Sequence, residues 1–205
     1  MAYFPFFADI ENMNILVAGG GTVALRKIEK LLPFSPAITV AAPQIDERIK
    51  ALGVKLIPSQ FKEEMLDGVK AVIAATDSKE VNRSIACLCR ERNIPVNAVD
   101  DREQCSFIFP ALVKKGELTV GISTAGASPA AAIWLKEQIN ALLPDSLPLI
   151  LDYLEGLRPI IKDRVKSEQR RGEIFKELFA LCLETGGVPQ DGTLMEILRE
   201  EQEKW

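Results

Sequence analysis

The sequence feature that most constrains the fold is a glycine turn between an apolar run and an amphipathic segment. Residues 14–18 form a short apolar run typical of a buried strand, and Gly19-Gly20-Gly21 follows directly. Residues 22–32 then place apolar side chains at helical spacing and charged ones, Lys27 among them, on the outward face, until Pro33 ends the helix. A strand, a glycine turn and a helix in this order predict the first unit of a dinucleotide-binding fold.

The alternation of strands and helices continues through the first half of the chain. Apolar runs predict strands over residues 37–41, 54–57, 70–75 and 94–99, with a helix over residues 79–92. Because these runs are apolar throughout, a parallel sheet covered on both faces is expected. We therefore predict an α/β protein with an N-terminal Rossmann-type parallel sheet.

The pattern changes after Asp101. Two strands are predicted over residues 107–114 and 118–123, followed by a helix over residues 129–142 with Ser128 as its N-cap. The rest of the chain is charged and helical in pattern. We expect three parts: an NAD-binding Rossmann domain over residues 1–112, a small α+β dimerisation segment over residues 113–145, and a helical C-terminal domain over residues 146–205.

The glycine turn fits the dinucleotide fingerprint G-x-G-x-x-A. The first glycine permits the tight turn, the second lets a pyrophosphate approach the backbone, and Ala24 lets the helix pack closely on the strand. The helix N-terminus offers unpaired N–H groups to the phosphates. In this setting dinucleotide binding is favoured over a purely structural turn. The expected cofactor contacts here are Gly19, Gly20, Gly21, Thr22, Val23 and Ala24.

One part of the fingerprint is missing after the second strand. An acidic residue is expected there to bind the adenosine ribose, but the sequence reads Ala41-Ala42-Pro43-Gln44. Ala42 and Pro43 are expected to line the cofactor through this loop. No arginine stands in these four positions to bind a 2′-phosphate, which favours NAD and leaves NADP open.

The chain contains no histidine, which narrows its chemistry. Ser-His and Cys-His nucleophilic catalysis are excluded, and so is a His-ligated metal site. The four cysteines are expected to be reduced, partly buried thiols, and no metal site is predicted. They are Cys87, Cys89, Cys105 and Cys182.

Charge and hydropathy restrict the partners and the compartment. The formal net charge of -4 argues against a nucleic-acid binder with a basic surface. No apolar run approaches the roughly 20 residues of a membrane-spanning helix, and the first residues do not resemble a signal peptide. We expect a cytoplasmic protein that contacts neither nucleic acid nor membrane.

Four more segments, together with the glycine turn, make the chain similar to a known family. In this order and spacing they resemble the precorrin-2 dehydrogenase family, which includes the N-terminal module of siroheme synthases. The resemblance covers residues 1–143 and extends to the opening Tyr3-Phe4-Pro5-Phe6-Phe7. The segments are Ala74-Ala75-Thr76-Asp77 with Asn82, Val96-Asn97-Ala98-Val99-Asp100-Asp101, Ser106-Phe107-Ile108-Phe109-Pro110-Ala111, and Gly121-Ile122-Ser123-Thr124-Ala125-Gly126-Ala127-Ser128-Pro129.

The resemblance implies a reaction and an assembly. The reaction is the oxidation of precorrin-2 to sirohydrochlorin, with NAD⁺ as hydride acceptor. Some members also insert ferrous iron to give siroheme; we expect a dehydrogenase only, although the sequence does not separate the two. The resemblance also implies a homodimer, with the segment after the Rossmann domain crossing between subunits.

Asp100 is the candidate catalytic residue. It lies just past the fifth predicted strand, at the edge where open α/β sheets gather their ligands. The oxidation releases a proton as well as a hydride, so a base near the substrate is needed. Asp100 matches the family's catalytic aspartate, whereas in isolation it would be read as part of a solvated turn. Its neighbour Asp101 is expected to be exposed.

Other cofactor contacts are expected after the fourth and fifth strands. Thr76 and Asp77 fall where the nicotinamide half should run, and capping of the next helix is an equally good and compatible interpretation. Asn97 and Val99 are assigned to the cofactor with them.

The substrate contacts are expected beyond the Rossmann sheet. Ser123 and Thr124 are assigned to the substrate, since the resemblance places a hydroxyl-bearing residue near the active site at Thr124; a loop leading into the Ser128 cap is the alternative. Because the substrate that the resemblance implies is a polycarboxylate, Arg102, Lys114 and Lys115 are candidates to attract it, or they are ordinary surface charges.

Two other functions compete with this interpretation. A nucleotide-sensing regulatory Rossmann module without catalytic activity would carry the same glycine turn. Such modules usually keep the acidic residue after the second strand, and they would not need the segments 106–110 and 123–129. A general small-molecule NAD reductase is the third possibility.

Overall fold

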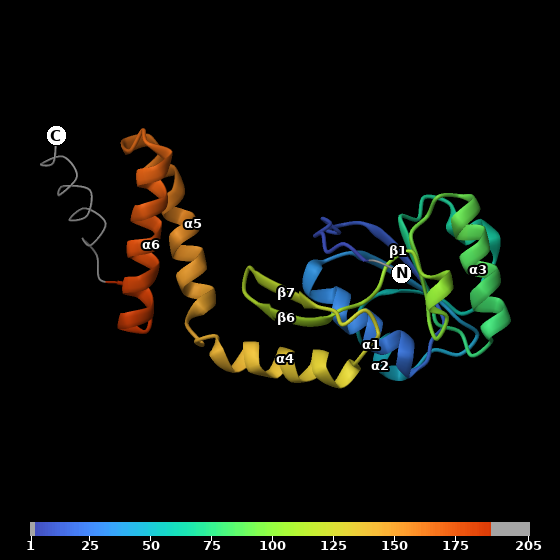
Figure 1. The fold of residues 1–205 in the computed structure, drawn as a ribbon. Coiled ribbons are helices and arrows are strands. Elements are labelled where there is room, and N and C mark those ends of the chain that lie inside the picture. Colours follow the sequence, from blue (N-terminus) through green and yellow to red (C-terminus); the bar gives the residue numbers. More distant parts are fainter. Residues whose placement is uncertain (1–2, 190–205) are drawn as a thin grey trace, which may run out of the picture. The chain divides into compact units, whose positions relative to one another are not determined.

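The chain forms two compact units. In the computed structural model, which describes residues 3–189, these units are Met1–Pro110 and Ala111–Trp205 (Figure 1). The further division of the second unit near residue 145 remains a prediction.

The first unit is a five-stranded parallel sheet of the order β3-β2-β1-β4-β5. The chain passes from the central β1 to one side for β2 and β3, and then crosses back to place β4 on the other side of β1. The carboxyl end of β1 is therefore the point where the strand order reverses, which is where such sheets bind ligands. The strands are β1 (Asn14–Ala18), β2 (Ala37–Ala41), β3 (Lys55–Ile57), β4 (Ala71–Ala74) and β5 (Val96–Ala98).

Helices cover both faces of this sheet. The predicted helices and strands are confirmed to within one to three residues at their ends, while a short helix after β2 was not predicted. The α-helices are α1 (Thr22–Leu31), α2 (Glu47–Lys50) and α3 (Lys79–Glu91), and the 3₁₀ turns are η1 (Leu32–Phe34), η2 (Glu63–Leu66) and η3 (Arg102–Gln104). This is the Rossmann-type α/β architecture expected from the sequence.

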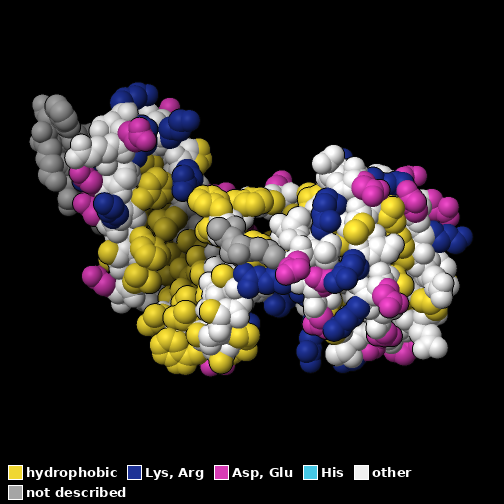
Figure 2. All heavy atoms as spheres, turned by 45° about the vertical axis from the view of Figure 1, so that its right-hand side comes forward, with side chains coloured by type: hydrophobic (Ala, Val, Ile, Leu, Met, Phe, Trp, Pro, Cys, Tyr) yellow, Lys and Arg dark blue, Asp and Glu magenta, His cyan; other side chains and the backbone are white. Residues whose placement is uncertain are grey.

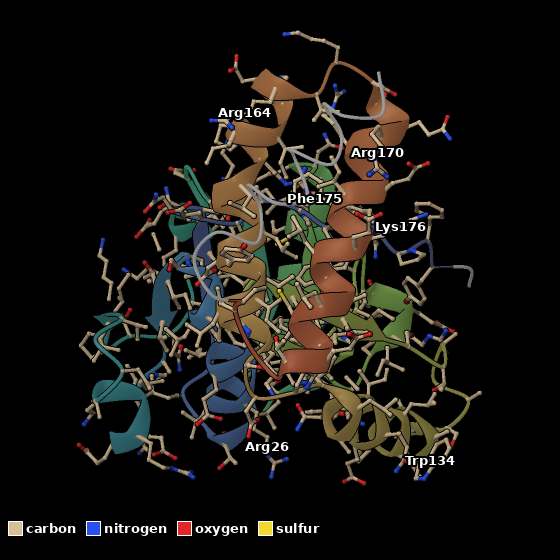
Figure 3. The ribbon with its side chains drawn as sticks, turned by 90° about the vertical axis from the view of Figure 1, so that its left-hand side faces the viewer. Arg26, Trp134, Arg164, Arg170, Phe175 and Lys176 are labelled. Carbon is tan, nitrogen blue, oxygen red and sulfur yellow. The ribbon has the colours of Figure 1, made fainter. Side chains whose placement is uncertain are left out.

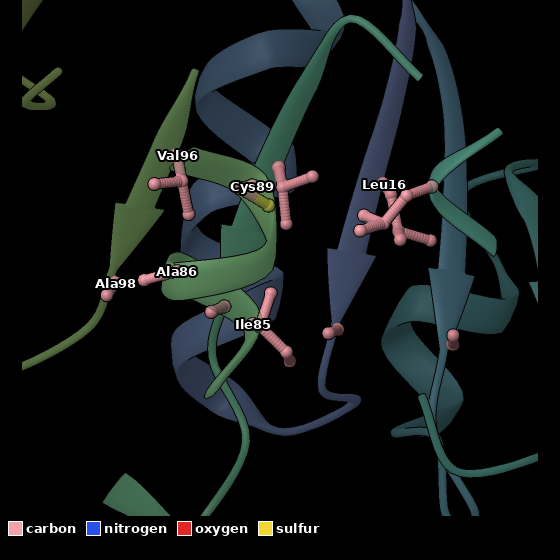
Figure 4. Packing of buried hydrophobic residues seen from close by; sticks show 11 residues of the cluster. Leu16, Ile85, Ala86, Cys89, Val96 and Ala98 are labelled. Atoms are coloured by element: carbon pink, nitrogen blue, oxygen red, sulfur yellow. The ribbon is translucent and has the colours of Figure 1, made fainter. Parts of the chain in front are cut away.

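The two faces of the sheet carry separate hydrophobic cores. Successive side chains of β1 point to opposite faces, so Ile15 and Val17 pack with α1 and α2, and Leu16 packs with α3. Figure 4 shows the core on the α3 side, where Ile85, Ala86 and Cys89 of α3 meet strand residues such as Val96. Burial on both faces explains why the strands are apolar without alternation.

The second unit contains a hairpin and three helices. The antiparallel strands β6 (Ala111–Lys115) and β7 (Leu118–Ile122) pack against α4 (Pro129–Leu142). The hydroxyl of Ser128 accepts a hydrogen bond from the Ala131 N–H, as its predicted role as N-cap requires. The first of these strands is shorter than predicted, because residues 107–110 precede the hairpin without pairing in it.

The last two helices form an antiparallel pair. They are α5 (Leu147–Arg164) and α6 (Glu168–Thr185), with Ile161, Ile174 and Leu178 buried between them. In Figure 3, Phe175 of α6 faces α5, where the Arg158 guanidinium lies 5.5 Å from its ring. This small core is distinct from the two cores of the first unit.

The second unit also exposes large hydrophobic side chains. On α4, Ile133 and Trp134 are 54% and 58% exposed, and Leu149 on α5 is 65% exposed. Figure 2 shows hydrophobic side chains gathered over this unit, and Figure 3 shows Trp134 at the surface of α4. Exposed apolar area of this kind commonly marks a protein–protein contact. None of the helices within residues 3–189 combines the length and apolar character needed to cross a membrane.

Candidate active site

The glycine turn packs closely between the loop after β4 and the loop after β2. Gly19 has a φ of +125°, and a Cβ at this position would collide with the carbonyl oxygen of Ala75 in the loop after β4. A Cβ on Gly20 would collide with the carbonyl oxygen of Gln44 in the loop after β2. The absence of side chains therefore lets the loops after β1, β2 and β4 meet at one edge of the sheet.

Gly21 faces open space instead. A Cβ there would have no heavy atom within 4 Å. Gly21 is the N-cap residue of α1, and no side chain caps this helix, so its first N–H groups remain available. A buried turn that ends in open space beside uncapped amides fits the diphosphate of a nicotinamide dinucleotide.

The loop after β2 brings a charged pair to this turn. The backbone N–H of Asp46 donates to the carbonyl of Gly20 at 2.9 Å. The Asp46 carboxylate caps α2 and binds the Arg48 guanidinium, with 2.6 Å between Oδ2 and Nη2. The Arg48 Nη2 also lies 3.5 Å from the hydroxyl of Thr22. These side-chain and backbone hydrogen bonds from Arg48 lower the pKa of Asp46 from 3.8 to about 2.

The pair of Asp46 and Arg48 brings charged groups to the loop after β2, where the sequence led us to expect none near the adenosine ribose. Ala42 and Pro43 follow β2 directly and neither carries charge; their contact with the cofactor remains a prediction. The loop folds back on Gly20, so a carboxylate and an arginine a few residues further on reach the turn. The sequence pattern did not reveal them because the fingerprint concerns only the residues directly after the strand.

A buried asparagine fixes the loop after β4. Asn82 of α3 is 3% exposed, and its Oδ1 accepts hydrogen bonds from the N–H and the hydroxyl of Thr76, at 2.9 and 2.7 Å. Its Nδ2 donates to the Thr76 carbonyl at 3.0 Å. Ser78, rather than Asp77, caps α3 by accepting from the Val81 N–H. Thr76 thus lies beside Gly19 in a rigid loop, and its contact with a cofactor remains a prediction.

Asp100 lies in a strained turn directly after β5. It is an exposed residue with a left-handed φ of 59°, a conformation that aspartate tolerates better than most residues. The N–H of the preceding Val99 donates to the Ala74 carbonyl at 2.9 Å and prolongs the sheet to this point. Asp100 therefore lies at the carboxyl ends of the strands, as its place in the sequence predicted, and its catalytic role remains a prediction.

The thiol of Cys105 forms hydrogen bonds with the backbone of Ala98, at the end of β5 just before this turn. Its Sγ accepts from the N–H of Ala98 at 3.2 Å and lies 3.1 Å from the Ala98 carbonyl, to which it donates. Burial raises the pKa of this thiol, so it stays protonated and can donate. The side-chain Nδ2 of Asn97 donates to the Phe107 carbonyl at 3.0 Å, while its buried Oδ1 has no hydrogen-bond partner among the described residues.

Lys27 is a cation near Asp100 that the sequence pattern did not assign to the site. The helical spacing placed it among the outward charges of α1, but it is half-buried, with its Nζ 4.1 Å from the centre of the Phe109 ring. Burial lowers the pKa of Lys27, and the nearby Lys30 adds to this, whereas Cys105 and Asp100 act in the opposite direction. The outward assignment is wrong because the chain after β5 folds over this face of α1.

Two other sequence expectations need correction. Asp101 was expected to be exposed, but its side chain is 19% exposed and pairs with Arg83 of α3 at 3.0 Å. The cysteines are unpaired, as expected, but Cys87 is exposed rather than partly buried. Cys89 is buried, and burial raises its pKa to about 11. Within residues 3–189 no three His, Cys, Asp or Glu side chains stand close enough together to hold a metal ion.

The predicted substrate contacts have local partners. The Thr124 hydroxyl bonds to the backbone of Ser128, and the Ser123 hydroxyl accepts from the Ala125 N–H, so both shape the loop before α4. Lys115 binds Asp145 at 2.9 Å, and Lys114 donates to the Gly116 carbonyl. Arg102, in the first unit, lies 5.5 Å from the Tyr3 ring. Their contact with substrate remains a prediction.

Comparison with known proteins agrees with this geometry. A family model described as "Putative NAD(P)-binding" matches residues 6–111. The siroheme synthase of Pseudoalteromonas translucida is 37% identical over 183 residues, covering 87% of this chain and 39% of the relative. That of Tolumonas auensis is 36% identical over 208 residues, covering 100% of this chain and 43% of the relative. The chain thus spans about two fifths of these relatives.

A solved structure extends the likeness to both units. The structure of SirC, a precorrin-2 dehydrogenase, matches with a TM-score of 0.69 at 25% identity. The match covers 99% of this chain and 100% of that one.

Proposed function

The chain belongs to the precorrin-2 dehydrogenase family of NAD(P)-binding proteins, and from this premise we propose that it oxidises precorrin-2 to sirohydrochlorin with NAD⁺. One observation carries the proposal. The glycine turn, which leads into the uncapped helix α1, and Asp100 both lie at the carboxyl ends of the strands of the parallel sheet. A nucleotide sensor would need the first feature but has no use for the second.

The proposed chemistry divides between the cofactor and the protein. The bound nicotinamide supplies a hydride acceptor. Gly21 and the first amides of α1 bind the diphosphate, and the Thr76 loop, fixed by Asn82, supports the nicotinamide half. Asp100 takes the proton that the substrate loses, since its exposed carboxylate is free to reach a bound molecule. Precorrin-2 loses one hydride and one proton in total.

NAD⁺, rather than NADP⁺, is the proposed acceptor. The two residues directly after β2, Ala42 and Pro43, offer no cation to a 2′-phosphate. The arginine that does reach the glycine turn is already paired with the carboxylate of Asp46.

Anaerobic turnover with precorrin-2 tests the proposal. NADH and sirohydrochlorin absorbance should rise together for the wild type and fall about 10²–10⁴-fold in rate for Asp100→Asn, the usual size of a general-base contribution. Glu103→Gln, an exposed carboxylate in the following turn, should keep wild-type turnover. Equal rates for Asp100→Asn would remove this residue from the mechanism. A folded wild type that binds NAD⁺ without turnover would favour the sensor function.

Iron insertion is the second candidate activity. It is supported by the likeness to siroheme synthases, whose name implies formation of siroheme. In that reaction Asp100 would accept pyrrole protons; of the two activities, we propose the dehydrogenase alone. Adding ferrous iron to purified sirohydrochlorin and the protein, with no NAD⁺, and recording the siroheme spectrum would test this activity separately.

A homodimer and a cytoplasmic location complete the proposal. Exposed Ile133, Trp134 and Leu149 supply an apolar surface for a second copy of the second unit. Trp134→Glu should shift the sedimentation of the protein toward the monomer. The four cysteines lie within the described residues and are unpaired, as is usual in a reducing compartment. Cell fractionation would test the location.

A further inference from the structure

We propose that Arg48 binds the diphosphate of the dinucleotide and that Asp46 holds the guanidinium in place for this contact. The inference rests on the proposed function, because it assumes a dinucleotide on the glycine turn. It assigns a binding role to a pair that lies a few residues beyond the position where the fingerprint's usual acidic residue is missing.

The backbone fixes this pair relative to the turn. The N–H of Asp46 donates to the carbonyl of Gly20 at 2.9 Å, in the middle of the three glycines. A Cβ on Gly20 would lie 2.9 Å from the Cα of Ile45, so the loop before Asp46 runs along the turn without a gap. The backbone of Asp46 is therefore tied to the glycine turn.

The side chains then direct the guanidinium toward α1. Nε and Nη2 of Arg48 bind the two oxygens of Asp46, at 3.0 and 2.6 Å, which fixes the plane of the guanidinium. Nη2 also lies 3.5 Å from the hydroxyl of Thr22, the first residue of α1. The cation thus stands beside the uncapped N–H groups that would receive the phosphate oxygens.

Arg48 keeps donors free for a ligand. The ion pair uses its Nε and Nη2 edge, and Nη1 makes no hydrogen bond to the residues that the structure describes. The side chain is 62% exposed, so a bound diphosphate could reach it. A planar guanidinium with several donors is well suited to phosphate oxygens.

The carboxylate of Asp46 gives the pair a preference between cofactors. It lies on the loop after β2, the part of a Rossmann fold that approaches the adenosine ribose. A diphosphate on the glycine turn can use Arg48 together with the α1 amides, whereas a 2′-phosphate added to the adenosine ribose would lie nearer the Asp46 carboxylate, whose negative charge repels it. The pair therefore favours NAD⁺ over NADP⁺.

Calorimetric titration with NAD⁺, NADP⁺ and ADP-ribose tests the assignment. Arg48→Gln should weaken NAD⁺ and ADP-ribose equally, by about tenfold, the size of one charge-assisted hydrogen bond at a partly exposed site. The loss should shrink at high salt because the contact is exposed. Arg92→Gln is the matched control, since Arg92 also pairs with carboxylates, Glu63 and Asp67, but ends α3 at the opposite edge of the sheet. It should bind all three ligands as the wild type does.

A second variant tests the role of Asp46. Asn can still cap α2, so Asp46→Asn should fold while it releases Arg48. The preference for NAD⁺ over NADP⁺ should fall several-fold, and an unchanged preference would refute the role of Asp46.

Other outcomes distinguish a failure of the Arg48 assignment from a failure of the proposed function. Unchanged binding of NAD⁺ by Arg48→Gln, or loss of NADP⁺ binding alone, would overturn the diphosphate assignment. A wild type that binds none of the three ligands would instead refute the proposed function.

Discussion

Replacing Asn82 with alanine should loosen the loop after β4 and destabilise the first unit. The side chain makes three hydrogen bonds to Thr76, two as acceptor and one as donor. At about 1 kcal/mol each, their loss lowers the free energy of unfolding by up to about 3 kcal/mol, and by about 2 kcal/mol where the Thr76 hydroxyl turns to the Ser78 carbonyl, 3.1 Å away. Because Thr76 is half-buried, water can only partly replace them. The alanine variant should also bind NAD⁺ more weakly, since this loop packs against Gly19.

Native-state hydrogen exchange without cofactor measures this effect in each unit. A loss of about 3 kcal/mol corresponds to roughly a hundredfold faster exchange of the most protected amides in β1 and β4. Amides of α5 and α6 belong to the other unit and should exchange at the wild-type rate. Asn82→Asp would place a carboxylate oxygen against the Thr76 carbonyl oxygen at a buried site, so it should destabilise the unit at least as much as alanine.

Ser84→Ala is the matched control, because Ser84 is exposed on the same helix. It should change the unfolding free energy by less than about 0.5 kcal/mol. Acceleration of less than about threefold in Asn82→Ala, well below the hundredfold worked out from these bonds, would refute the reasoning. It would mean that the Thr76 loop is held by its packing against Gly19 and not by the asparagine.

Three further predictions follow from the first unit. Gly19→Ala should lower the melting temperature sharply because its Cβ would collide with Ala75, whereas Gly21→Ala should melt like the wild type but bind NAD⁺ more weakly; equal melting temperatures would contradict this. Asp46 has a folded pKa of about 2, below its ordinary 3.8, so its stabilising effect should be full above pH 4 and disappear as the pH falls to 2. In urea unfolding at pH 6, Asp46→Asn should therefore have a lower free energy of unfolding than the wild type. This difference should shrink toward pH 2, and a difference that stayed constant with pH would contradict the prediction. Leu16→Ala should cost about 3 kcal/mol in the same assay, since Leu16 is fully buried between the strands and α3; a cost below about 1 kcal/mol would show that this core collapses around the cavity.

The sequence predicted those parts of the fold that depend on local patterns. The strands of the parallel sheet were predictable because each is an uninterrupted apolar run, and α1, α3 and α4 because their spacing or caps are distinct. The short α2 was missed because four residues, Glu47–Lys50, cannot establish a helical period. The start of β6 was placed too early because apolar Phe107 and Phe109 resemble a strand but pack elsewhere.

The candidate site was predictable only where one segment carries it. The glycine turn and Asp100 follow strands directly, so their place at the sheet edge follows from the topology. The contacts of Arg48 with Thr22 and of Lys27 with Phe109 join segments far apart in the sequence. Such pairs depend on how loops fold back over the sheet, which no local pattern contains. The three bonds of Asn82 also depend on the turn that brings Thr76 back to α3.

We expect the three glycines of the turn to be retained to different degrees as related sequences diverge. Gly19 and Gly20 are required by the protein itself, since any side chain would strike the loops after β4 and β2. Only Gly21 leaves room for something outside the chain. A descendant that lost its nucleotide would therefore still need the first two glycines in order to fold, and would be free to change the third. In this family, a glycine at the third position is the better sign that a dinucleotide is still bound.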